Sequence, residues 1–134
     1  MKTDEIKKRV ENTIKGHGEI LAAYLYGSFA SGSPVEESDI DIGLLLRADY
    51  TPEPLYEARI SRELDKALGR EVEARVLNHK NLIFLHQVLK HSKPLFSRDD
   101  KERIRFETET YSKYLDFKPF CEEYNQIRRE RLLQ

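Results

Sequence analysis

Two short runs in the first third of the chain carry residue types that could bind a phosphate and a metal ion. The first is Gly27-Ser28, which closes an apolar stretch, with Gly32 a few residues further on. Glycine allows a tight turn and a close approach of the backbone to a ligand. If residues 28–31 start a short helix, its free N–H groups favour a phosphate, and the Ser28 hydroxyl adds a further donor. The first run therefore predicts a phosphate-binding turn.

The second run, Ser38-Asp39-Ile40-Asp41-Ile42, has two aspartates separated by one residue. On a strand, such residues project from the same face. Two neighbouring carboxylates repel each other unless a cation lies between them. Mg²⁺ takes oxygen ligands of this kind and commonly shares them with substrate phosphates. Together the two runs predict a site for metal-assisted nucleotidyl transfer, with Asp39 and Asp41 as metal ligands.

A helical alternative exists for the second run. Ser38-x-x-Asp41 also resembles a helix capping box, which would make Asp39 a solvated acid of a first turn. On that interpretation the preceding glycines form an ordinary flexible loop. Gly43 and the β-branched Ile40 and Ile42 are poor helix formers, so we predict a strand here.

The elements that must position these runs follow from apolar periodicity and from turn residues. Ile6, Val10 and Ile14 indicate an amphipathic helix, which we expect Thr3 to cap. Asn78 is predicted to cap a later helix, and Pro119 to separate two C-terminal helices. The predicted helices cover about 3–15, 55–68, 79–90, 99–115 and 119–132, and the predicted strands 20–26, 38–46, 71–77 and 93–97. This order predicts an α+β (mixed α/β) fold, a small sheet with helices packed on it.

Length and charge limit the possible classes of protein. The 134 residues predict one domain over 1–134, with a core of about 5–97 and a helical extension of about 98–134. The 23 Lys and Arg residues against 24 Asp and Glu argue against direct nucleic-acid binding driven by charge. A single cysteine excludes an internal disulfide, and no apolar run reaches membrane-spanning length. We therefore expect a cytoplasmic protein that makes no membrane contact.

The two runs also resemble a known signature. Gly27-Ser28, Gly32 and Ser38-Asp39-x-Asp41 resemble that of the DNA-polymerase-β-like nucleotidyltransferase superfamily, and the chain is most similar to its minimal branch. The resemblance implies that the glycine-serine turn binds the nucleotide triphosphate and that the aspartates hold one or two Mg²⁺ ions. It assigns nucleotide binding to Gly27, Ser28, Gly32 and Ser38.

Two positions depart from the family pattern. Family members carry a third carboxylate on a neighbouring strand, which joins the metal site and helps to activate the attacking hydroxyl. By position this is Glu73, where the family most often has Asp. Ser31 stands where many relatives have an arginine that could contact phosphate. The resemblance thus implies Asp39, Asp41 and Glu73 as catalytic residues and metal ligands.

The second half of the chain resembles one branch more closely. Residues 84–89 and 93–97, and the charged helix through Tyr111, are similar to minimal nucleotidyltransferase antitoxins, which pair with HEPN-domain ribonuclease toxins. This implies ATP-dependent transfer of AMP to a tyrosine of a toxin partner in a hetero-oligomer. Two alternatives stay open: transfer to a small hydroxyl compound, as in aminoglycoside nucleotidyltransferases, and neutralisation of the partner by binding alone.

Overall fold

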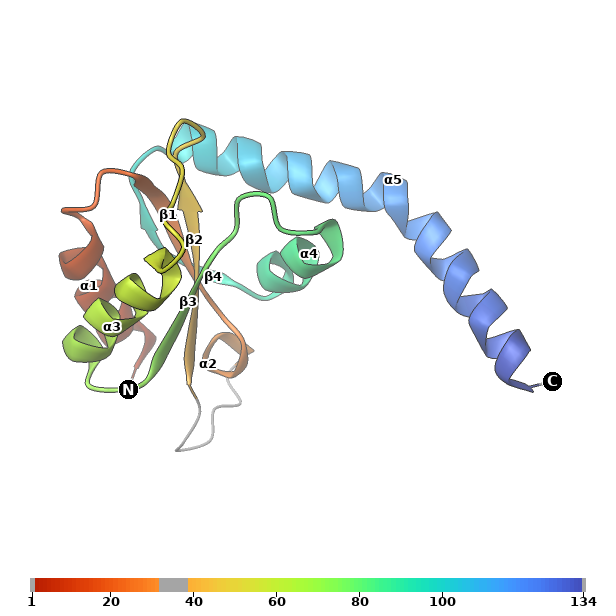
Figure 1. Ribbon diagram of the computed structural model, residues 1–134, viewed down its shortest axis with the longest axis horizontal. Coiled ribbons are helices and arrows are strands. Elements are labelled where there is room, and N and C mark those ends of the chain that lie inside the picture. Colours follow the sequence, from red (N-terminus) through yellow and green to blue (C-terminus); the bar gives the residue numbers. More distant parts are fainter. Residues whose placement is uncertain (1, 32–38, 134) are drawn as a thin grey trace.

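A four-stranded sheet forms the centre of the molecule, with helices on both of its faces (Figure 1). The computed structural model describes residues 2–31 and 39–133. In chain order the elements are α1 (Thr3–Ile14), β1 (Ile20–Tyr26), α2 (Ser28–Ser31), β2 (Ile40–Leu46), α3 (Tyr56–Leu68), β3 (Val72–Val76), α4 (Leu82–Lys90), β4 (Lys93–Ser97) and α5 (Asp100–Leu133). The predicted α+β class is confirmed.

The strands are ordered β3-β2-β1-β4, so the two most apolar strands are the interior ones. β1 pairs antiparallel with β2 and β4, while β2 and β3 run parallel. Interior strands are covered on both faces, which explains why the sequence of β1 is a continuous apolar run.

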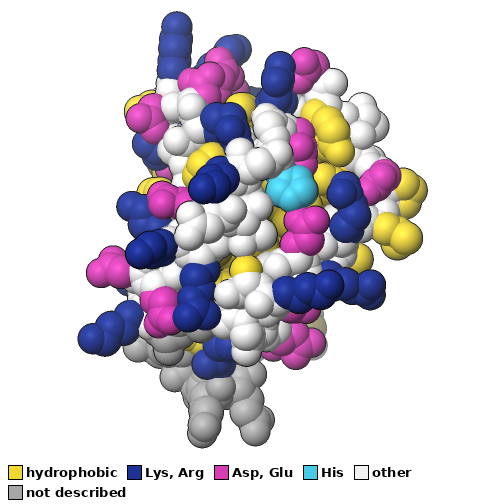
Figure 2. Space-filling model, turned by 90° about the vertical axis from the view of Figure 1, so that its left-hand side faces the viewer, with side chains coloured by type: hydrophobic (Ala, Val, Ile, Leu, Met, Phe, Trp, Pro, Cys, Tyr) yellow, Lys and Arg dark blue, Asp and Glu magenta, His cyan; other side chains and the backbone are white. Residues whose placement is uncertain are grey.

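Each face of the sheet has its own hydrophobic core. On one face α1 and α3 bury Ile6, Val10, Ile60 and Leu64 against the strands. On the other, α4 and the first part of α5 cover a smaller cluster that includes Tyr24 of β1. On the face shown in Figure 2, acidic and basic side chains are interspersed, in keeping with the net charge of −1.

The outer edge of β3 is closed by side chains of α3. The Val72 N–H donates to Asp65 Oδ1 at 2.6 Å and the Ala74 N–H to Ser61 Oγ at 2.9 Å. The Val76 N–H donates to Glu57 Oε2 at 2.8 Å. The acceptors are spaced by four on one helix face, and the donors by two on the strand. This edge is therefore already hydrogen-bonded and cannot add another strand.

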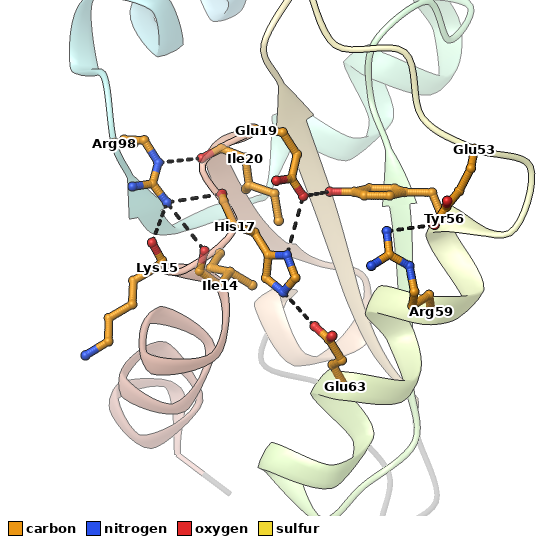
Figure 3. Close-up of polar contacts among 10 residues, drawn as sticks. All are labelled: Ile14, Lys15, His17, Glu19, Ile20, Glu53, Tyr56, Arg59, Glu63 and Arg98. Atoms are coloured by element: carbon orange, nitrogen blue, oxygen red, sulfur yellow. Dashed lines mark hydrogen bonds and ion pairs between the residues drawn. The ribbon is translucent and has the colours of Figure 1, made fainter.

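The end of the sheet at which β1 begins is held by a network of polar contacts (Figure 3). Arg98 donates to the carbonyl oxygens of Ile20 at 3.0 Å and Lys15 at 2.9 Å. The Tyr56 hydroxyl donates to Glu19 Oε2 at 2.7 Å. The network connects α1, β1, α3 and the residue after β4.

Three local predictions were wrong. Thr3 is the first residue of α1, and the cap position is Lys2, which makes no side-chain capping bond. Asn78 does not cap a helix, because its side chain bonds the backbone N–H and C=O of Leu46, each at 2.8 Å. The cap of α4 is Asn81, whose Oδ1 accepts from the Phe84 N–H at 2.8 Å.

The third error concerns the C-terminal helices, which form the single helix α5 with Pro119 inside it. Proline removes one backbone hydrogen bond, and here the helix bends instead of ending (Figure 1). On both sides of Pro119 the residues have the mixed charge and large side chains that are typical of a helix, so the helix continues past the proline. Within the described residues, no helix is both long enough and apolar enough to span a membrane.

Candidate active site

The predicted phosphate turn lies at the end of β1. Gly27 has a φ of 74°, a left-handed conformation that favours glycine. Its C=O accepts from the Ala30 N–H at 3.2 Å, which starts α2 directly after the strand. A Cβ built on Gly27 would collide with Asp41 Oδ2 and lie 3.2 Å from Asp41 Cγ. The backbone of the turn and the carboxylate of Asp41 are therefore in direct contact.

The aspartates lie at the start of β2, beside that turn. Asp39 immediately precedes the strand and is exposed, while Asp41 is the second residue of the strand and is half-buried. Ile40 and Ile42 are fully buried on the opposite face, so the alternation predicted from the sequence is confirmed. The helical alternative for this segment is wrong, because residues 40–46 pair with strands on both sides.

The neighbouring strands bring two more polar side chains to Asp41. In the register of the sheet, Asp41 pairs with Glu73 on β3 and with Tyr26 on β1. Directly paired residues project from the same face, so the three side chains share one patch. Tyr26 also contacts the edge of Phe84 on α4, with 6.5 Å between ring centroids.

The electrostatics of this patch are those of crowded negative charge. Burial, and then the nearby charges of Glu73 and Asp39, raise the pKa of Asp41 above its usual value, and the Arg75 guanidinium opposes them only in part. Burial and the charge of Asp41 raise the pKa of Tyr26 to about 12. Oxygen donors with uncompensated charge are what a hard divalent cation requires, so the residues fit Mg²⁺.

Glu73 is close to the aspartates but is paired with another residue. Its Oε1 contacts Nη2 of Arg75, two residues along the same strand. In the part of the chain that the structure describes, no three His, Cys, Asp or Glu side chains are grouped so that they could hold a metal ion. Glu73 would have to leave Arg75 to join Asp39 and Asp41 around a shared ion.

The remaining site residues are placed only in part. Ser28 is the first residue of α2, beside Gly27. Gly32 and Ser38 lie outside the described residues. Sequence reasoning assigned no role in the site to Tyr26 or Arg75. Period-two alternation puts Arg75 on the face of Glu73, but Tyr26 joins the patch through the antiparallel register of β1 and β2, which the sequence does not specify.

Several solved structures share the fold of this chain. A chain of a toxin–antitoxin complex solved with AMP-PNP superimposes with a TM-score of 0.74 at 20% identity, covering 96% of this chain and 98% of that one. A chain of the complex between tri-AMPylated Shewanella oneidensis HEPN toxin and MNT antitoxin gives 0.71 at 18%, covering 98% of each. A chain of an MntA–HepT toxin–antitoxin complex gives 0.71 at 18%, covering 98% and 100%. At these identities the similarity establishes a shared fold.

The family follows from the sequence comparison. Comparison with curated proteins found no match. The family model Polymerase beta, Nucleotidyltransferase matches residues 8–101, more than half of the chain. The matched range includes the Gly27-Ser28 turn, both aspartates and Glu73. The chain therefore belongs to the polymerase beta nucleotidyltransferase family.

Proposed function

We propose that this nucleotidyltransferase transfers AMP from ATP to a tyrosine hydroxyl of a HEPN-type toxin and acts as the antitoxin of that pair. The observation that carries the proposal is the contact between Gly27 and the Asp41 carboxylate. It supports the proposal because the turn proposed to bind the phosphates and the carboxylate proposed to bind the metal lie within one small patch. The structural neighbours support the choice of acceptor, because they include chains from a complex that contains a tri-AMPylated HEPN toxin and from a toxin–antitoxin complex with AMP-PNP.

Each residue of the patch has a proposed role. Asp39 and Asp41 would hold one or two Mg²⁺ ions, with Glu73 as a third ligand. The bound Mg²⁺ would neutralise charge on the phosphates during transfer. The backbone of Gly27 and the Ser28 hydroxyl orient the triphosphate, together with Gly32 and Ser38. Glu73 accepts the proton of the incoming tyrosine hydroxyl, whose oxygen then forms the bond to the α-phosphorus as pyrophosphate leaves.

The test is transfer of labelled AMP from ATP to a purified HEPN-domain toxin offered as the candidate partner, in the presence of Mg²⁺. We expect Asp41→Ala to abolish labelling. Asp49→Ala is the matched control, because Asp49 is exposed and pairs only with Arg47 in the loop after β2. Labelling that survives Asp41→Ala, or its absence with the native protein, contradicts the proposal.

Neutralisation by binding alone is the second candidate, and the Glu73–Arg75 pair favours it. In this structure Arg75 pairs with the proposed third carboxylate, Glu73. Such a pairing is compatible with a site that has lost its catalytic activity. Cells expressing the toxin distinguish the two candidates. Protection by a protein carrying both Asp39→Ala and Asp41→Ala would show that binding suffices.

A further inference from the structure

Among the described residues, contacts between α5 and the body of the protein come from the first part of the helix. Phe106 contacts the core on the α4 face, and Thr110 is buried. The Tyr111 hydroxyl donates to the Leu89 carbonyl at 3.2 Å, and Tyr114 stacks on His86 with 3.5 Å between ring centroids. Beyond these contacts α5 extends away from the other elements (Figure 1). Packing against the body of the protein therefore does not explain why the outer half of α5 is helical and carries large apolar side chains.

This outer half carries a row of exposed large side chains. Phe117, Phe120, Tyr124 and Ile127 are 40%, 67%, 62% and 42% exposed. Their spacings of three, four and three put all four on one face of the helix, and we call them the distal stripe. The stripe covers roughly 15 Å of helix at about 1.5 Å per residue. Single exposed apolar residues are common on protein surfaces, but a continuous row of this kind marks an interaction surface.

An acidic row follows one flank of the stripe. Asp116, Glu123 and Glu130 recur every seven residues, and Asp116 and Glu123 immediately precede Phe117 and Tyr124. All three are exposed. None takes part in an ion pair with another described residue, although Glu130 accepts from Gln126 at 3.5 Å. The stripe therefore presents an apolar seam with a free negative edge, which is the arrangement of a helix that pairs with a basic partner.

We propose that the distal stripe docks an amphipathic helix of the toxin partner, one that carries basic residues along the flank facing Asp116, Glu123 and Glu130. The inference rests on the proposed function for the existence of that partner. The resemblance of this chain to the antitoxin branch implies a ribonuclease as the partner, and a ribonuclease must hold a phosphate backbone and so carries basic surface, which suits the acidic row. A second copy of this chain suits it less well, because antiparallel pairing along the stripe would bring the two acidic rows together. An anionic membrane surface would be repelled by the same row.

The stripe alone is too short for a stable pair of helices, so it acts as one contact among several. Two heptads in isolation are marginal in water. Docking there adds to whatever contact the active site makes with the acceptor tyrosine. The contribution of the stripe is then best measured as binding of the toxin without nucleotide, where the chemistry does not enter.

The experiment is calorimetric titration of the full chain with the HEPN-domain toxin used in the labelling test, without ATP or Mg²⁺. The double variant Phe120→Ser and Tyr124→Ser should weaken binding by about 100-fold, as truncation of two aromatic anchors does. The matched control is Glu122→Ser and Arg129→Ser, on the opposite face of the same helix segment, which should leave Kd within about twofold. Circular dichroism checks that both variants keep the helix.

Charge reversal tests the acidic row separately. Glu123→Lys and Glu130→Lys should weaken toxin binding by about 10-fold and reduce its dependence on salt, because favourable charge pairs are lost. Unchanged affinity in the stripe variant overturns the proposal. So does light scattering that shows a dimer of this chain which the stripe variant dissociates, or binding of the native chain to phosphatidylserine vesicles through the stripe.

The outcomes separate this inference from the proposed function. If the native chain binds the toxin and the stripe variant does not, but no AMP is transferred, docking stands and the catalytic proposal fails. If AMP is transferred and the stripe variant binds as tightly as the native chain, the catalytic proposal stands and docking fails.

Discussion

At the scale of single residues, Gly27 is the position where the fold and the proposed chemistry constrain each other most closely. Its positive φ disfavours any side chain, and its missing Cβ leaves the space that the Asp41 carboxylate occupies. A larger residue would both strain the turn and displace a proposed metal ligand.

A comparison of two alanine variants separates these effects. Gly69, at the C-terminus of α3, has a φ of 68°, but a Cβ there would meet nothing within 4 Å. Gly27→Ala and Gly69→Ala should each cost about 1–2 kcal/mol in the free energy of unfolding, from the left-handed backbone. Only Gly27→Ala should also abolish AMP transfer. Urea unfolding and the labelling assay measure the two effects, and an active Gly27→Ala would contradict the assigned contact.

Asp41 gives a second prediction at this scale. Its pKa is raised in the folded protein by burial and by the carboxylates of Glu73 and Asp39, so the ionised form is disfavoured relative to the unfolded chain. The sign follows: above its usual pKa, ionised Asp41 destabilises the metal-free fold, and the cost disappears as pH falls and the group is protonated. Asp41→Asn should therefore raise the melting temperature at pH 7.5 without Mg²⁺.

The same variant should lose the stabilisation that Mg²⁺ gives the native chain, because a carboxylate ligand is gone. Thermal melts with and without Mg²⁺, at a concentration on the order of 10 mM, measure this stabilisation. A melting temperature below that of the native chain in the absence of metal would show that Asp41 is a structural residue first.

At the scale of elements, α3 stabilises the sheet in two ways. Ile60 and Leu64 fill the core. The side chains that accept hydrogen bonds from the outer edge of β3 are Glu57, Ser61 and Asp65. That edge strand carries Glu73, so the position of the proposed third carboxylate depends on α3.

Removing one of these acceptors should measurably loosen the edge. Ser61→Ala leaves the half-buried N–H of Ala74 without its partner, at a cost of about 1–3 kcal/mol. Ser112→Ala is the control, because Ser112 is an exposed serine of α5 and its change should stay within about 0.5 kcal/mol. Chemical denaturation gives both values, and hydrogen exchange should show faster exchange at residues 72–76 in Ser61→Ala only. Equal stability of the two variants would mean that the bond contributes little.

At the scale of the whole molecule, the two ends of the sheet differ in purpose. The end at which β1 finishes carries crowded carboxylates that cost stability, and the other end carries satisfied polar contacts that connect four elements. Functional sites are commonly less stable than the scaffold that holds them.

The stabilising end should make folding sensitive to acid. Burial alone would raise the pKa of Glu19, but the hydrogen bond from Tyr56 and the charges of His17 and Arg59 bring it below its usual value of 4.5. A carboxyl with a lowered pKa contributes stability that is complete above about pH 4.5 and is lost as the pH falls through the folded value. Glu19→Gln keeps an acceptor for Tyr56 but cannot titrate. Urea unfolding between pH 3 and 7 should show a shallower loss of stability in Glu19→Gln, and parallel curves for the two proteins would contradict the assignment.

The sequence by itself determined most of the elements and indicated much of the candidate site. Apolar periodicity placed the helices and strands because burial in a small domain requires it, and the offsets of Gly27, Ser28, Asp39 and Asp41 indicated the family before any contact was known. The sequence determined helix caps and helix limits less well. Asn78 and Asn81 are equally suitable capping residues in the sequence, and only the structure shows that the Asn78 side chain bonds the Leu46 backbone while Asn81 caps α4.

Only the tertiary structure decided which side chains face one another across neighbouring strands. The register of three strands brings Tyr26, Asp41 and Glu73 together, and register depends on long-range pairing that local residue types do not specify. The pairing of Glu73 with Arg75, and the exposure of one face of α5, likewise depend on what the rest of the chain covers. The sequence identifies residues able to bind a nucleotide, while their proximity and charge arise only when distant strands meet.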